Sequence, residues 1–189
     1  MALMTQETVS RPGLRELADG VRAIVDQGLP ARRTAWLVAD LLRGGALPGP
    51  EVLTEEERRG DPERYTSRVL HAEDGFSIVG LVWLPGQETP VHDHIAWCTF
   101  GVVQGAEHEI LYRLDGDRLV RVGESTNGAG EVSGFAPPGD IHRVRNVSDG
   151  TAISIHIYGA DVTRAGGSSV RRVYDLPEAE GAEPSRSGR

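Results

Sequence analysis

The spacing of apolar positions changes near Tyr65, from helical periodicity before it to short alternating runs after it. Apolar residues recur every three or four positions from Leu14 to Val25, which predicts an amphipathic helix. The same spacing predicts a second helix over Ala31–Arg43, ended by a glycine pair. Thr54 and Glu57 stand at the spacing of a capping box and indicate one further turn.

After Tyr65 the chain breaks into short β-like runs separated by Gly, Pro, Asp and Asn. The runs lie at roughly 65–71, 75–84, 96–104, 107–114, 117–123, 132–135, 141–147, 151–158 and 170–175. Asp115-Gly116 and Asp149-Gly150 are hairpin cues, so an antiparallel barrel or sandwich is favoured over a parallel sheet. We therefore expect a single domain over 1–175, with helices at about 13–60 outside a barrel at about 65–175, and a disordered tail over 176–189.

Composition limits the classes of partner. The chain has 189 residues, a formal net charge of −8 and a pI of about 5.2, with its basic residues scattered. This argues against nucleic acid or an anionic membrane as the main partner. The sequence has neither an apolar run of about 18 residues nor a secretory signal, so a cytoplasmic location is expected. Cys98 is the single cysteine, which excludes an internal disulfide.

Two histidines mark the candidate chemistry. His92 and His94 are separated by one residue within a stretch of strand-like residues, so their side chains point the same way and can share one metal ion. An iron or zinc centre normally takes at least three protein ligands. His142 follows a Pro-Pro-Gly turn that leads into a later strand, and it is the candidate third ligand.

Both histidine stretches resemble the paired motifs of the cupin superfamily in residue type and in spacing. The matching positions are Gly86, His92, His94, Cys98 and Gly105 in the first motif, and Pro137, Gly139, His142 and Asn146 in the second. The resemblance implies a mainly β jelly-roll barrel, with the N-terminal helices packed outside. Many cupins carry a glutamate metal ligand where this chain has Cys98. A site of histidines alone leaves a ferrous ion more positive than a site that includes a carboxylate.

A third pattern narrows the family. Ser154, His156 and Tyr158 alternate along one predicted strand, so all three project from one face and can form a hydrogen-bonded chain. With Cys98 at the glutamate position, the sequence resembles the cysteine dioxygenase (thiol dioxygenase) family of cupins. That resemblance implies Fe(2+) as the cofactor, held by the three candidate histidines. It also implies catalytic roles for Ser154, His156 and Tyr158, with a possible thioether crosslink between Cys98 and Tyr158.

The implied reaction oxidises a small thiol with dioxygen to its sulfinate, and the substrate choice stays open. L-Cysteine is the leading candidate, and 3-mercaptopropionate or a related mercapto acid is the alternative. Arg68 lies near the place of the carboxylate-binding arginine of cysteine dioxygenases, whereas Arg172 fits the late arginine of bacterial mercaptopropionate dioxygenases. The alternative from another functional class is a non-catalytic metal-binding cupin that binds or senses a small ligand. A monomer or small homo-oligomer is expected.

Overall fold

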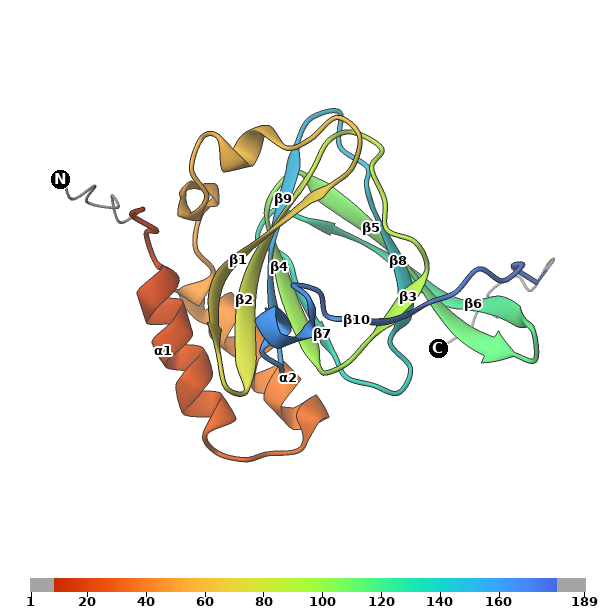
Figure 1. Cartoon of the computed structure of the whole chain (residues 1–189), viewed down its shortest axis with the longest axis horizontal. Helices are drawn as coiled ribbons and strands as arrows, with labels where there is room; N and C mark the ends of the chain where they lie inside the picture. Colours follow the sequence, from red (N-terminus) through yellow and green to blue (C-terminus); the bar gives the residue numbers. More distant parts are fainter. Residues whose placement is uncertain (1–8, 180–189) are drawn as a thin grey trace, which may run out of the picture.

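The computed structural model describes residues 9–179 and begins with two helices on the outside of a β-barrel (Figure 1). Helix α1 spans Leu14–Val25 and helix α2 spans Ala31–Leu41. The chain then passes through a π-helical turn, η1, at Leu42–Ala46 and two 3-10 turns, η2 at Pro50–Val52 and η3 at Glu57–Arg59. The predicted first helix is confirmed with its bounds, and the predicted second helix ends in the π-helical turn.

The capping box predicted from Thr54 and Glu57 is present. The backbone N–H of Thr54 donates to Glu57 Oε2 at 3.0 Å, and the backbone N–H of Glu57 donates to Thr54 Oγ1 at 3.2 Å. Arg11 also donates to both carboxylate oxygens of Glu57 at 2.9 Å. Glu57 therefore fixes the turn before the barrel and ties it to the chain that precedes α1.

Within residues 9–179, ten strands follow and form two antiparallel five-stranded sheets. They are β1 (Thr66–Glu73), β2 (Phe76–Trp83), β3 (His92–His94), β4 (Cys98–Gln104), β5 (Ala106–Asp115), β6 (Arg118–Gly128), β7 (Val132–Phe135), β8 (Ile141–Asn146), β9 (Ala152–Tyr158) and β10 (Val170–Val173). The first sheet has the order β1-β2-β9-β4-β7, and the second has the order β10-β3-β8-β5-β6. A 3-10 turn, η4 (Val162–Ala165), lies between β9 and β10. The prediction of a mainly β barrel with helices outside is confirmed.

Strand β9 shows how the sequence separates the two layers. Its residues are all buried, because helices cover one face of the first sheet and the second sheet covers the other. Ile153, Ile155 and Ile157 belong to the core shared with α1 and α2. Tyr158 belongs to a second core between the sheets, and Ser154 and His156 lie on its side of the strand. A polar face of β9 is thereby held inside the barrel.

Of the two predicted hairpin turns, one joins paired strands and the other joins strands of different sheets. Asp115-Gly116 joins the paired strands β5 and β6, as a hairpin cue predicts. Asp149-Gly150 instead joins β8 to β9, which lie in different sheets. A turn signal specifies a reversal of the chain but not the strand that receives it, so this cue was wrong as a hairpin. The predicted runs did not include β3, a strand of only three residues held between β8 and β10, although the strand geometry expected for His92 and His94 is present there.

The tail predicted to begin at residue 176 is described as far as Ala179. In this part, Glu178 lies beside Leu119, accepts from the Tyr112 hydroxyl at 3.0 Å and pairs with Arg121 at 2.7 Å. This portion therefore packs on β5 and β6, and the remainder of the predicted tail, 180–189, lies outside the described residues. Among residues 9–179 no helix is both long enough and apolar enough to cross a membrane.

Candidate active site

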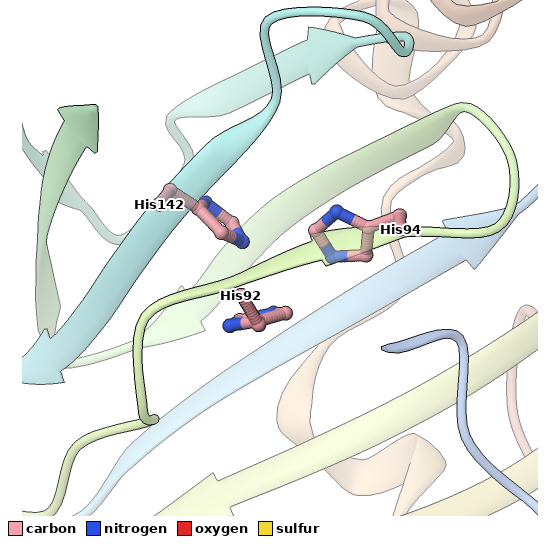
Figure 2. A group of neighbouring side chains, drawn as sticks. All are labelled: His92, His94 and His142. Atoms are coloured by element: carbon pink, nitrogen blue, oxygen red, sulfur yellow. The ribbon is translucent and has the colours of Figure 1, made fainter. Parts of the chain in front are cut away.

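Three buried histidines converge inside the barrel (Figure 2). His92 and His94 come from β3, and His142 comes from β8, where it is paired directly with His92 across the two strands. One ring nitrogen from each histidine lies within 4.8 Å of the other two. The predicted set is therefore brought together with its imidazoles facing one point, which is the geometry that a shared metal ion requires.

Each of these imidazoles is held from behind through Nδ1. The acceptors are the Pro90 carbonyl for His92 at 3.0 Å, Asp140 Oδ2 for His94 at 3.3 Å, and Glu109 Oε1 for His142 at 2.6 Å. Since all three partners are acceptors, we assign the proton of each ring to Nδ1, which leaves the Nε2 lone pairs for a metal. Supports of this kind are a common feature of histidine metal sites.

The electrostatics also suit a cation. Burial, followed by the neighbouring rings of His142 and His94, lowers the pKa of His92 from 6.5 to about 3. Burial likewise lowers the pKa of His94, although Asp140 opposes the shift. Both rings are therefore neutral near pH 7 and need lose no proton to bind a metal. The donor set thus fits a metal cofactor.

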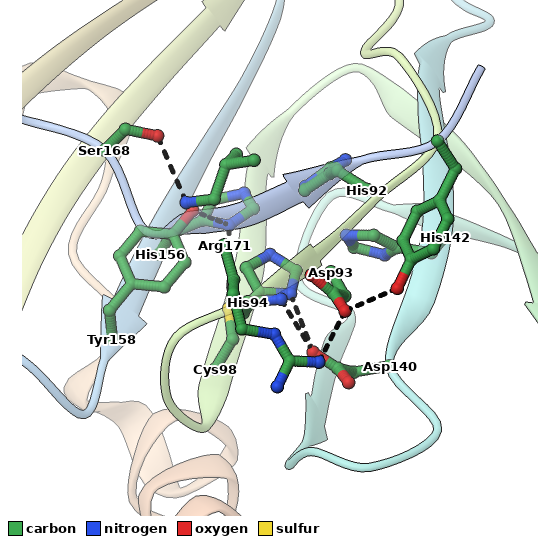
Figure 3. Close-up of polar contacts among 12 residues, drawn as sticks. His92, Asp93, His94, Cys98, Asp140, His142, His156, Tyr158, Ser168 and Arg171 are labelled. Carbon is green, nitrogen blue, oxygen red and sulfur yellow. Dashed lines mark hydrogen bonds and ion pairs between the residues drawn. The ribbon is translucent and has the colours of Figure 1, made fainter.

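A hydrogen-bonded chain lies on the opposite sheet, along β9, and Figure 3 shows two of its members, His156 and Tyr158. Ser154 Oγ is 3.0 Å from His156 Nε2, and His156 Nδ1 is 3.2 Å from the Tyr158 hydroxyl. The Trp83 indole N–H donates to Ser154 Oγ at 3.3 Å. Burial holds the pKa of His156 well below its usual value and that of Tyr158 well above its usual value, so both groups are neutral near pH 7. The predicted serine, histidine and tyrosine are therefore in contact.

Cys98 lies beside this chain. On the paired strands β4 and β9 it stands directly opposite Tyr158, and its sulfur is 3.9 Å from His156 Nδ1. Burial raises the pKa of its thiol well above the ordinary value, with smaller contributions from Glu109 and Asp140. Cys98 is therefore a protonated thiol near pH 7, paired across the strands with Tyr158.

A cavity of about 560 Å³ connects the histidines to solvent. The three candidate ligands, His156 and Tyr158 all line it, as do the apolar side chains of Val79, Leu81, Trp83 and Val144. The cavity has room for a small molecule between the metal-facing histidines of one sheet and the phenol of the other.

The predicted arginines lie in different places. Arg68, on β1, lines the cavity, and its Nε is 3.2 Å from Glu57 Oε1. Arg172, on β10, lies with its guanidinium 5.6 Å from the centre of the Tyr174 ring and is not among the residues that line the cavity. Arg64 lines the cavity and was not predicted. Since Arg64 precedes β1 in an irregular segment, no periodicity could have singled it out.

Sequence reasoning also missed the acids that support the site. Glu109 and Asp140 are buried and contact His142 and His94, respectively. Asp93, between the two histidines of β3, is fully buried and accepts from Arg171 and from the Tyr174 hydroxyl. No sequence pattern singled out Glu109, because its inward position depends on the pairing of β5 with β8.

The family model for cysteine dioxygenase type I matches residues 56–164, which is more than half of the chain. The chain belongs to the cysteine dioxygenase type I family. All three candidate ligands and the chain of Ser154, His156 and Tyr158 fall within the matched residues. The resemblance inferred from the two motifs is thereby confirmed, and so is the cupin jelly-roll expected from it.

The solved structures that resemble this member of the cysteine dioxygenase type I family include an oxalate oxidase and two proteins described as cupins. A recombinant oxalate oxidase in complex with glycolate is 20% identical, with a TM-score of 0.42 and 53% of each chain covered. An RmlC-like cupin from Desulfovibrio desulfuricans is 27% identical with a TM-score of 0.37, and the match covers 52% of this chain and 86% of the other. The cupin domain of Schizosaccharomyces pombe Cnp3 is 14% identical with a TM-score of 0.42, and the match covers 54% and 65%. The match spans about half the length of the oxalate oxidase.

Proposed function

We propose that the protein is a non-haem iron dioxygenase that oxidises L-cysteine with dioxygen to cysteine sulfinate. The observation that carries the proposal is the position of three converging imidazoles across one small cavity from a buried phenol. Both atoms of dioxygen end on the thiol sulfur, so oxidation of the sulfur balances reduction of dioxygen. Family membership supports a thiol and dioxygen as the reactants.

His92, His94 and His142 would hold the iron through Nε2, with no protein carboxylate among them. Bound there, a ferrous ion supplies affinity for a soft thiolate and for dioxygen at its open positions. Glu109 and Asp140 keep the rings oriented by accepting from Nδ1 of His142 and His94. Their negative charges also partly offset the charge of a bound cation.

Tyr158 is the catalytic residue on the facing strand. The contact with His156 fixes the phenol oxygen, and burial keeps the phenol protonated near pH 7. A phenol so held can donate a hydrogen bond to a substrate oxygen that gains negative charge during the reaction. The apolar side chains of Val79, Leu81 and Val144 line the cavity beside it and lower the local polarity, which strengthens that interaction.

Arg68 is the arginine that we favour for the substrate carboxylate; its guanidinium pairs with Glu57 and its side chain is 61% exposed, so it must turn into the cavity to reach a substrate. The sequence linked Arg68 to the cysteine enzymes and Arg172 to the mercaptopropionate enzymes, and of the two only Arg68 lines the cavity. A guanidinium suits the substrate carboxylate because its planar fork makes paired hydrogen bonds. The direct pairing of Cys98 with Tyr158 across β4 and β9 also suits the crosslink expected of a cysteine dioxygenase.

Oxygen uptake with a panel of thiols tests this assignment. The full-length protein, loaded with ferrous iron, is given L-cysteine, 3-mercaptopropionate or cysteamine, and the sulfinate product is identified by mass spectrometry. Turnover of L-cysteine in preference to the others is the expected result. Preference for 3-mercaptopropionate would change the substrate and keep the chemistry. No turnover of any thiol by protein with stoichiometric iron would leave a non-catalytic metal-binding cupin.

The metal ligands have a matched test. His142→Ala is expected to abolish iron binding and activity together, because it removes a ligand from a set of three. His108→Ala is the control, since His108 lies on the neighbouring strand β5 and contacts Thr126 at the surface. Stoichiometric iron in the His142 variant would show that the ligand assignment is wrong.

A further inference from the structure

Strand β5 places two carboxyl groups inside the barrel. Glu107 and Glu109 are separated by one residue and are both buried, so they share the inward face of the strand. Glu109 contacts the candidate ligand His142. Glu107 is fully buried, and neither of its oxygens has a hydrogen-bond partner among residues 9–179. A buried carboxylate without a partner is costly, so its presence calls for a physical reason.

Glu107 interacts electrostatically with Ser154, the first member of the hydrogen-bonded chain on β9. Burial raises its pKa from 4.5 to about 7, and the polar groups that oppose this shift are the Ser154 hydroxyl and the Trp83 indole. The titratable groups coupled to it are Glu109, which raises its pKa further, and Tyr158, whose own pKa Glu107 raises. The Ser154 hydroxyl and the Trp83 indole are therefore the polar groups that act on the carboxyl, although neither forms a hydrogen bond with it in the structure.

The Ser154 hydroxyl has one proton to donate and can accept two hydrogen bonds. Trp83 already donates to it at 3.3 Å, and His156 Nε2 lies 3.0 Å away as either donor or acceptor. The Ser154 hydroxyl can therefore fill its hydrogen-bonding capacity in two ways. It donates to Glu107 and accepts from His156, or it accepts from Glu107 and donates to His156.

We propose that Glu107 is the fourth member of this chain and sets the direction of its hydrogen bonds. When Glu107 is charged, it accepts a hydrogen bond from the Ser154 hydroxyl. His156 then carries its proton on Nε2, donates from there to Ser154, and accepts a hydrogen bond from the Tyr158 hydroxyl at Nδ1. Protonated Glu107 donates to Ser154, which donates to His156 Nε2. The imidazole proton is then on Nδ1 and faces the phenol oxygen, which leaves the phenol proton free to point into the cavity.

Glu107 would thus be a positioning residue that acts on the phenol through two intervening side chains. The direction of the hydrogen bonds follows from the buried polar groups alone, whereas its effect on thiol oxidation rests on the proposed function. A phenol O–H that points into the cavity can stabilise a negative charge on a substrate oxygen. A phenol O–H that donates its hydrogen bond to His156 cannot.

The test is the tautomer of His156, followed by nitrogen-15 NMR in the full-length protein loaded with diamagnetic zinc. The wild type is expected to change from the Nδ1–H form to the Nε2–H form as the pH rises, with a midpoint near 7, the pKa of Glu107. Glu107→Gln is expected to abolish this transition, because glutamine does not titrate. Glu107→Asp retains a carboxyl and is expected to retain a transition.

Glu124→Gln is the matched control, since Glu124 lies on β6 and is largely exposed, and the transition is expected to persist. A transition that survives Glu107→Gln, or a wild type without one, would overturn the proposal. Should Glu107→Gln fail to fold, carbon-13 titration of the Glu107 carboxyl in the wild type decides. A midpoint different from that of His156 contradicts the coupling. The same spectra can be recorded without metal, so failure of the proposed iron chemistry is distinguishable from failure of this inference.

Discussion

Replacing Glu109 tests whether the carboxylate behind a histidine sets the strength of metal binding. Glu109 is buried on β5, and its Oε1 lies 2.6 Å from Nδ1 of His142, the shortest of the three supporting contacts. Glu109→Leu removes both the acceptor and the negative charge. Glu109→Gln retains an amide oxygen that can accept from Nδ1 and removes only the charge. The two variants therefore separate orientation of the ring from electrostatic support.

The expected loss follows from what this contact does. Acceptors that orient a histidine ligand typically contribute a factor of about 10–100 to metal affinity, or about 1.4–2.8 kcal/mol. We expect Glu109→Leu to reach the upper part of that range, because the 2.6 Å contact is short and the leucine leaves Nδ1 of a buried ring without an acceptor. Glu109→Gln should fall near the lower end.

Anaerobic competition with a chromophoric chelator measures the affinity for ferrous iron in each variant. Thermal unfolding without metal shows whether the fold is kept, and Glu124→Gln on the neighbouring strand provides a surface glutamate control. Wild-type affinity in a folded Glu109→Leu protein would refute the reasoning. Equal losses in the leucine and glutamine variants would instead attribute the whole effect to charge.

Three further predictions concern other parts of the chain. If Cys98 and Tyr158 form a thioether, intact mass after turnover should fall by two hydrogen atoms, and Cys98→Ser should abolish that change; an unchanged wild-type mass would count against the crosslink. Arg68→Met should raise KM for L-cysteine and leave cysteamine, which has no carboxylate, unaffected; equal effects on both thiols would remove Arg68 from substrate binding. Hydrogen bonding from Arg11 lowers the pKa of Glu57 from 4.5 to about 2, so the folded state favours its charged form. Urea titrations should show Glu57→Gln less stable than wild type by about 1–3 kcal/mol near pH 7. That difference should shrink as the pH falls from about 4.5 to about 2, and a pH-independent difference would contradict the ion pair as its source.

Local patterns predicted the parts of the fold that depend on local physics. The first helix was predicted from apolar spacing with the bounds that the structure has, and the alternation of Ser154, His156 and Tyr158 placed them on one face of β9. The arrangement of Asp149-Gly150 could not be predicted in the same way. Its turn sends the chain from one sheet to the other, and the choice depends on which sheet edge is available after folding.

The supporting groups were missed for a different reason. Residue type alone does not distinguish a buried acid such as Glu109 or Asp140 from the many solvated acids of a chain with net charge −8. Only the inward register of β5, fixed by its pairing with β8, reveals that Glu109 faces a histidine. The roles of Arg68 and Arg172 likewise depend on which strand borders the cavity, which is a property of the assembled barrel.

The two halves of the site come from opposite sheets, and this division has a consequence for how function can be lost. The candidate ligands lie on β3 and β8, whereas the phenol and its partners lie on β9 and β4. The halves approach each other where the rings of His94 and Tyr158 stack with centroids 5.9 Å apart. Val79 and Val144 pack in the core between the sheets near this point. A smaller side chain there would change the spacing between metal and phenol while each sheet keeps its own hydrogen bonds. Such a variant should therefore retain metal affinity and lose turnover. That result would show that activity depends on the spacing between the two sheets as well as on the residues that each sheet carries.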